Sequence, residues 1–157
     1  HPNRLPNPHF FVDLDETLIA SNEDVSRLSL RPGVHVFLIN LRLLGPVFLF
    51  TAANKAHADY CVDYFGLGGL FDKRFYNARC PTSVIAEMNF LVDDQALTTE
   101  DILEECVTKS WLQKSKKFSD TLVPIYVAPY EIVALKNERP NLEDALQAIY
   151  GKLNGEW

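Results

Sequence analysis

The chain has 157 residues, of which 47% are apolar and 23% are charged, and this balance argues against disorder and fits one hydrophobic core. Its formal net charge of −6 disfavours a general nucleic-acid-binding role, which would call for a basic surface. No apolar run approaches the roughly 20 residues that cross a membrane, so we expect no membrane partner.

The first part of the chain predicts an arm, a strand, a loop and a helix. Residues 1–9, rich in Pro and Asn, are expected to form a flexible arm before a single domain over residues 10–157. Phe10–Leu14 is a short apolar run typical of a buried strand. The polar stretch 20–29 predicts a loop, and a helix is expected from Pro32 to Gly45. The buried face of this helix recurs at helical spacing: Val34, Phe37, Leu38 and Leu41.

A second strand and helix follow. Val47–Thr51 predicts a buried strand, and the next helix is expected to end at Gly66. The residues that this helix is expected to bury are Ala58, Cys61, Val62 and Phe65. A turn with a short strand is expected over 68–77, and Phe90–Asp94 again predicts a strand that ends in acidic residues.

The last part of the chain continues the alternation. A helix is expected from Thr98 to about Lys109, and Leu122–Val127 predicts a strand that Pro124 confines to an edge of the sheet. A final helix begins at Asn141 and is expected to bury Leu142, Ala145, Leu146 and Ile149. This alternation predicts an α/β, three-layer, Rossmann-like fold whose mostly parallel sheet is covered on both faces.

Polar residues fall where the predicted strands end. Asp13 with Asp15, then Thr51, then Asp93 with Asp94 each follow an apolar strand. In a parallel sheet these ends share one edge, where ligands bind. Carboxylates gathered there would repel one another unless a cation lay between them, and oxygen ligands favour Mg²⁺.

This set of side chains is suited to phosphate ester hydrolysis. One carboxylate can attack phosphorus to form an acyl phosphate, and a second, two residues on, can protonate the leaving oxygen and then activate water. A threonine hydroxyl can donate to a phosphate oxygen. The alternative is that the same acids only cap turns and end strands.

Three segments resemble motifs of the haloacid dehalogenase superfamily. The segment from Asp13 to Leu18 reads D-L-D-E-T-L and resembles the D-x-D-x-T motif, while Thr51 and Asp94 lie in segments similar to the second and fourth motifs. The small phosphatases of the RNA polymerase II C-terminal tail (FCP/SCP type) are the most similar branch. Their pattern resembles the segment 31–34, Ala58-Asp59, and the residues 78–80.

The resemblance implies a role for each residue. Asp13 would be the nucleophile and Asp15 the general acid and base, and Mg²⁺ would be bound by Asp13, Asp15, Asp93 and Asp94. The residues implied to bind the phosphorylated substrate, a protein or a small molecule, are Thr17, Thr51, Ala52 and Lys55. The enzyme would be a phosphoric monoester hydrolase with an aspartyl-phosphate intermediate.

Two departures from the family pattern bear on activity. The family lysine before the fourth motif is missing, and Lys55, in the first turn after Thr51, is the candidate to replace it, ahead of Lys73 and Arg79; otherwise it is a solvated helix lysine. The stretch 19–49 is too short for a helical cap, and the β-insert of the tail phosphatases is expected to be missing. We therefore expect an essentially capless, open site.

Other features leave alternatives open. A catalytically degenerate binding or assembly module is the second hypothesis, and a nucleic-acid end phosphatase is the third, which depends on the basic stretch from Lys109 to Lys117. His35 and His57 are interpreted as surface or packing residues. The three scattered cysteines predict reduced thiols, hence a cytoplasmic or nuclear protein.

Overall fold

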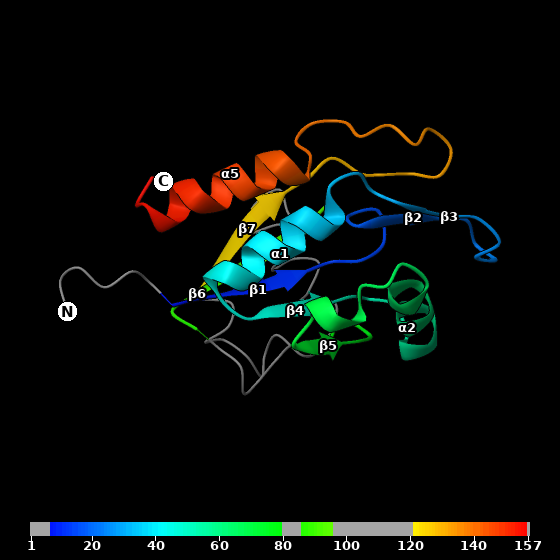
Figure 1. The fold of residues 1–157 in the computed structure, drawn as a ribbon, viewed down its shortest axis with the longest axis horizontal. Helices are drawn as coiled ribbons and strands as arrows, with labels where there is room; N and C mark the ends of the chain where they lie inside the picture. The colour runs from blue at the N-terminus through cyan, green and yellow to red at the C-terminus, as the bar shows by residue number, and fades with distance from the viewer. Residues whose placement is uncertain (1–6, 80–85, 96–120, 157) are drawn as a thin grey trace.

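The computed structural model describes residues 7–79, 86–95 and 121–156. Its centre is a five-stranded parallel sheet with the strand order β5-β4-β1-β6-β7 (Figure 1). These strands are, in chain order, β1 (Pro8–Val12), β4 (Val47–Phe50), β5 (Lys73–Phe75), β6 (Met88–Asp93) and β7 (Leu122–Tyr126). The predicted α/β fold with a parallel central sheet is confirmed, and β1 begins two residues before the predicted Phe10.

Strand β1 occupies the centre of the sheet because its side chains are apolar on both faces. Phe10, Phe11 and Val12 are fully buried. Phe10 stacks on Phe90 of β6 with ring centroids 5.4 Å apart, whereas Phe11 packs against Phe48 of β4 at 5.1 Å. Neighbouring side chains on a strand point to opposite faces, so the two aromatic pairs contribute to different sides of the core.

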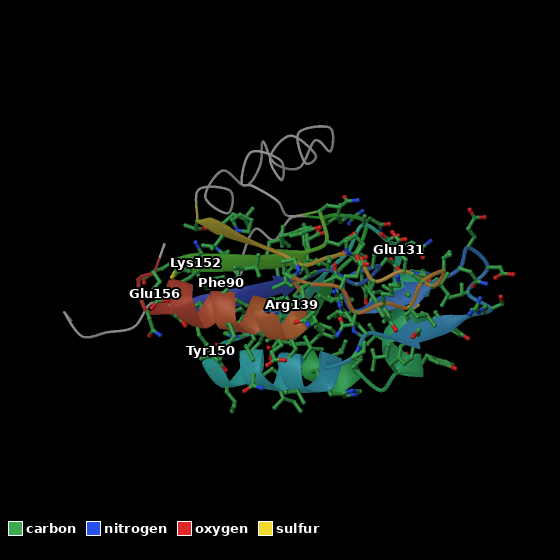
Figure 2. All side chains as sticks on the ribbon, turned by 90° about the horizontal axis from the view of Figure 1, so that it is seen from above. Phe90, Glu131, Arg139, Tyr150, Lys152 and Glu156 are labelled. Carbon is green, nitrogen blue, oxygen red and sulfur yellow. The ribbon has the colours of Figure 1, made fainter. Side chains whose placement is uncertain are left out.

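Helices α1 (Val34–Leu44) and α5 (Leu142–Leu153) lie side by side on one face of the sheet (Figures 1 and 2). Tyr150 of α5 donates to Asn40 of α1 across this contact, at 3.5 Å. The apolar positions that the sequence assigned to the buried faces of both helices are buried. A capping box between Asn141 and Asp144 begins α5, as expected for a helix start.

Helix α2 (Lys55–Tyr64) follows β4 directly, and a short 3-10 turn, η1 (Gly68–Leu70), leads into β5. Ala58, Cys61 and Val62 of α2 are fully buried, as predicted, while Phe65 is only partly buried at the end of the helix. Strand β7 pairs with β6 on one side and lies at the edge of the sheet, so the edge position predicted from Pro124 is confirmed.

The loop predicted over residues 20–29 is wrong. This stretch belongs to an antiparallel hairpin of β2 (Ile19–Ser21) and β3 (Leu28–Leu30). The Asn22 side chain closes the turn, since its amide oxygen accepts from the Arg27 N–H at 3.0 Å and its amide group donates to Ser26 at 2.8 Å. The polar residues therefore form the turn of a hairpin whose strands are short, which is why the pattern resembles a loop.

Some sequence features lie outside the described residues: the helix expected from Thr98, the basic stretch Lys109–Lys117, Cys80 and Cys106. Cys61 is a free, buried thiol, consistent with the reduced cysteine that we expect. Within the described ranges, no helix combines the length and the apolar character that a bilayer crossing requires.

The turn between α1 and β4 provides a test of this packing. A Cβ atom at Gly45 would lie 2.3 Å from the main-chain oxygen of Pro8 in β1, a contact that the backbone cannot relieve cheaply. We expect Gly45→Ala to lower the free energy of unfolding by about 1–3 kcal/mol, measured by urea titration. Gly69→Ala is the control, because its Cβ meets nothing within 4 Å, and it should stay within about 0.5 kcal/mol of wild type. Equal midpoints for the two variants would contradict the packing.

Candidate active site

The site lies at the carboxyl ends of β1 and β6. The two strands pair in parallel with Val12 opposite Val92, so the next residues, Asp13 and Asp93, lie side by side. The Asp13 N–H donates to the Val92 carbonyl at 2.9 Å and continues the ladder into the site. The chain order reverses at β1, because β4 pairs on one side and β6 on the other. Such a reversal is where parallel sheets leave a crevice for a ligand.

A tight turn after β1 brings Thr17 back towards Asp13. The Leu14 carbonyl accepts from the N–H groups of Thr17, Leu18 and Ile19 at 3.3, 2.9 and 3.2 Å. Glu16 adopts a left-handed backbone with φ 64°, which costs about 1–2 kcal/mol for a side chain with a Cβ. The surrounding hydrogen bonds maintain this strained conformation.

Thr17 connects the two acidic segments. It is fully buried; its Oγ1 accepts from the Asp94 N–H at 3.0 Å and lies 2.9 Å from Asp13 Oδ2 and 3.3 Å from Asp94 Oδ1. A hydroxyl has one hydrogen, so it donates to one carboxylate at a time or is shared between them. Thr17 was predicted to contact substrate, and the structure places its hydroxyl between the two carboxylates.

Three carboxyl groups crowd this edge of the sheet. One oxygen from each of Asp13, Asp93 and Asp94 lies within 4.8 Å of the others. Loss of hydration raises the pKa of Asp13 well above its ordinary value, and the charges of Asp93 and then Asp94 raise it further, against the opposing hydrogen bond from Thr17. Oxygen donors under such mutual repulsion are suited to a hard divalent cation.

Asp15 faces a residue that the sequence analysis did not assign to the site. Its Oδ1 lies 2.9 Å from Nε2 of His57, and the two side chains are 39% and 25% exposed. His57 was interpreted as a surface or packing residue, and the structure adds that it contacts Asp15. Its position in the first turn after Thr51, at the same edge of the sheet as Asp13, is the signal that could have identified it.

The remaining residues predicted for the site lie in the segment after β4 and at the start of α2. Thr51 is buried, and its Oγ1 accepts from the Ala53 N–H at 3.1 Å, with Ala52 exposed beside it. Lys55 is 71% exposed, its Nζ is paired with Asp59, and its charge lies 5.3 Å from the centre of the Tyr76 ring. Among the ion pairs of the described residues, none joins Lys55 to the carboxyl cluster.

Arg31 is a second residue of the site region that sequence reasoning missed. Its side chain is fully buried and donates to the Thr17 carbonyl at 3.4 Å, the Glu138 carbonyl at 3.2 Å and Asn137 Oδ1 at 3.0 Å. Burial lowers its pKa, whereas the nearby charge of Asp94 favours the protonated form. Arg31 thus provides a buried positive charge behind the acids. In the sequence, Arg31 belongs to the segment 31–34 that resembles the family pattern, but no role was assigned to it.

The hairpin β2–β3 and the segment between β7 and α5 extend beyond the carboxyl ends of the strands (Figure 1). Tyr130 of that segment donates its N–H to the Glu16 carbonyl at 2.8 Å, and its hydroxyl lies 2.7 Å from Ser29 of β3. The turn that follows β1 is therefore bonded on its outer side, and no helical cap stands between β1 and α1.

Comparisons with known proteins identify this arrangement. A model of the family described as NLI interacting factor-like phosphatase matches residues 8–98, which include Asp13, Thr51 and Asp94. No curated protein matches the sequence. Two solved structures, each with low sequence identity, show the fold that the chain shares.

The first is the HAD domain of the effector protein Lem4 from Legionella pneumophila, with a TM-score of 0.56 at 7% identity over 96% of this chain and 97% of that one. The second is Fcp1, an essential RNA polymerase II CTD phosphatase, with a TM-score of 0.50 at 18% identity. This second likeness covers 98% of the chain but 51% of Fcp1, so the chain spans about half of that structure. The fold is the HAD fold that the resemblance implied.

The repulsion within the cluster has a testable effect on stability. Because the pKa of Asp13 is higher in the folded than in the unfolded state, the folded state binds more protons, and stability falls as the pH rises above about 4. The loss is at most about 1.4 kcal/mol per pH unit for one proton. We expect Asp13→Asn to lack this fall and to be more stable than wild type near pH 7, in urea titrations with a chelator.

Glu23→Gln, which removes one exposed charge from the hairpin turn, is the control and should follow the wild-type profile. If the free energy of unfolding of Asp13→Asn differed from that of wild type by the same amount from pH 4 to pH 8, the pKa of Asp13 would not be raised in the folded state.

Proposed function

The chain belongs to the NLI interacting factor-like phosphatase family, and from that premise we propose that it hydrolyses phosphomonoesters with Mg²⁺ through an aspartyl-phosphate on Asp13. Family and fold together make it a HAD-type phosphatase. The metal and the intermediate are our inference. The observation that carries it is the convergence of Asp13, Asp93 and Asp94 within 4.8 Å beside Thr17.

The donor set of the cluster fits Mg²⁺. Its ligand atoms are carboxylate oxygens of Asp13, Asp93 and Asp94, with the main chain of Asp15 proposed as a further oxygen donor. Oxygen ligands favour Mg²⁺ over metals that prefer nitrogen or sulfur. When bound, the ion would offset the negative charge of the carboxylates and of the phosphate.

The proposed reaction has two steps. In the first, a carboxylate oxygen of Asp13 attacks phosphorus as the bond to the leaving oxygen breaks, and Asp15 gives that oxygen its proton, so an alcohol departs. In the second, water attacks the phosphorus of the aspartyl-phosphate and gives a proton to Asp15, which releases phosphate and restores Asp13. The Thr51 oxygen already accepts from the Ala53 N–H, which leaves the Thr51 hydroxyl hydrogen to donate to a phosphate oxygen.

Lys55 is the cation that we propose to contact the phosphate. It must first leave Asp59, and an exposed ion pair of this kind is worth only about 0–1 kcal/mol. The proposal is supported by the position of Lys55 in the first turn of α2, directly after the segment that carries Thr51.

We expect Lys55→Met to raise KM for p-nitrophenyl phosphate about 10-fold in steady-state kinetics, because the variant loses a charge-assisted contact. Lys136→Met, which removes an exposed lysine from the segment between β7 and α5, is the control and should leave KM unchanged. Equal KM values for the two variants would remove Lys55 from the site.

The substrate that we propose is a phosphorylated serine or threonine of a protein. The hairpin β2–β3 takes the place of a helical cap between β1 and α1, so a phosphate presented on a macromolecule can approach. Six carboxyl groups of the site region interact through their charges and would repel a polyanion: Asp13, Asp15, Glu16, Asp93, Asp94 and Glu131. This disfavours a nucleic-acid end as substrate. Fcp1, which shares the fold, is an RNA polymerase II CTD phosphatase.

One observation favours the second hypothesis, a degenerate binding module. Within the described residues, no lysine or arginine forms an ion pair with Asp13, so the cation that HAD-type catalysis usually employs is not in place there. An assay of phosphatase activity separates the binding-module hypothesis from the phosphatase hypothesis.

We expect purified protein to hydrolyse p-nitrophenyl phosphate with Mg²⁺, and to stop when EDTA removes the metal. Asp13→Asn should lose about 10³-fold or more in kcat because it lacks the nucleophile, while Glu23→Gln should retain wild-type turnover. Phosphate release from a phosphoserine peptide should exceed release from a 5′-phosphorylated oligonucleotide. A folded protein without turnover at any Mg²⁺ concentration would favour the binding module.

A further inference from the structure

The structure assigns His57 as a positioning residue that orients the carboxyl group of Asp15, and this inference rests on the proposed phosphatase function. Nε2 of His57 lies 2.9 Å from Asp15 Oδ1, across two segments that are 42 positions apart in the chain. The contact joins the turn after β1 to the first turn of α2, and it involves the side chain that the proposed mechanism uses twice.

The contact involves one oxygen of the carboxyl group. The terminal torsion of an aspartate is broad, so an unrestrained carboxyl group turns readily and presents either oxygen to a substrate. With Oδ1 held by the imidazole, Oδ2 is the oxygen that remains for proton transfer. Holding the reacting atom in place lowers the entropic cost of the step, and a misplacement of about 1 Å can cost about 10²-fold in rate.

His57 is itself held on a well-anchored part of α2. The main-chain N–H of His57 donates to the side-chain oxygen of Asn54, the N-cap of the helix, at 2.9 Å. One turn later, the sulfur of Cys61 lies 3.9 Å from the same Nε2, and Cys61 is fully buried. Burial raises the pKa of this thiol to about 11, so it remains neutral beside the imidazole. The imidazole therefore lies between a buried helix face and the Asp15 carboxyl group.

The location of α2 gives this contact a consequence for the whole site. Helix α2 follows directly on the segment that carries Thr51, so its first turn is covalently linked to the residue proposed to bind phosphate. The hydrogen bond from α2 to Asp15 thus couples the position of the proton donor to the position of the phosphate. Thr17 contacts Asp13 from within the turn after β1, with 2.9 Å between its Oγ1 and Asp13 Oδ2.

Two substitutions separate positioning from packing. His57→Leu removes the ring nitrogen and keeps much of the apolar bulk, whereas His57→Gln retains an N–H donor on a side chain of comparable reach. The substrates are p-nitrophenyl phosphate, whose leaving group departs readily as an anion, and a phosphoserine peptide, whose alkoxide needs a proton. The quantity compared is kcat/KM, because it reports the step in which the leaving group departs.

We expect His57→Leu to lower kcat/KM on the phosphoserine peptide by about 10- to 100-fold and on p-nitrophenyl phosphate by much less, because general acid catalysis matters most for the poorer leaving group. His57→Gln should recover most of the loss. His35→Leu, on the exposed side of α1, is the matched control and should match wild type on both substrates. Equal losses on the two substrates, or no recovery in His57→Gln, would overturn the proposal.

A second measurement does not depend on turnover. In ¹⁵N spectra of the imidazole groups, recorded in a chelator, Asp15→Ala should shift the Nε2 resonance of His57 and leave those of His35 in place. An unchanged His57 resonance would show that the contact is absent and would overturn the positioning role. If the resonance shifts but the wild-type protein hydrolyses neither substrate, the proposed phosphatase function fails, and the positioning role of His57 in that reaction fails with it.

Discussion

Repulsion among carboxylates at the end of the central strands is the constraint on which the rest of the site depends. The pairing of β1 with β6 sets Asp13 beside Asp93, and Asp94 follows in the same turn of chain. This arrangement raises the pKa of Asp13 and works against folding unless neighbouring groups compensate. A protein that only needed a stable sheet would gain by replacing one of these acids, so their convergence is best understood as a requirement of function.

Two groups compensate for the repulsion: the hydroxyl of Thr17, which lies between the acids, and the buried guanidinium group of Arg31. Thr17 lies between the two acidic segments and bonds to both of them. Arg31 is buried beneath the same turn, where its guanidinium group bonds to the Thr17 carbonyl and to the segment that precedes α5. The hairpin β2–β3 lies between these two residues in the chain. The hairpin therefore returns the chain so that Arg31 reaches the turn that carries Thr17.

The contacts around α2 divide into a charged outer network and a contact directed into the site. Asp59 accepts from Lys55, Arg74 and Tyr76, and these contacts hold the pKa of Asp59 well below its usual range. This network joins the helix to Arg74 of β5 and pairs Lys55 with Asp59. His57, two residues after Lys55, contacts Asp15 instead. The first turn of α2 therefore brings an imidazole into contact with Asp15, while Lys55 of the same turn is paired with Asp59.

The sequence by itself determined the sheet, the helices on one of its faces and the family. Uninterrupted apolar runs such as Phe10–Val12 predict buried strands, and helical spacing identified the buried faces of α1 and α5, because burial and periodicity are local properties. The D-x-D-x-T pattern was specific enough to indicate the family. The hairpin was missed because its strands are only three residues long and its turn is polar.

Only the tertiary structure decided which side chains meet. His57 and Arg31 contact Asp15 and Thr17 because segments distant in the chain pack together. The sequence places His57 near this edge of the sheet but does not specify which side chain it meets. Lys55 was expected at the phosphate because it follows Thr51, yet its orientation depends on Asp59 one turn along and on Tyr76 near the end of β5. Strand order and register are determined by packing between elements, and for that reason they position the acids, the imidazole and the buried arginine in ways that local pattern does not predict.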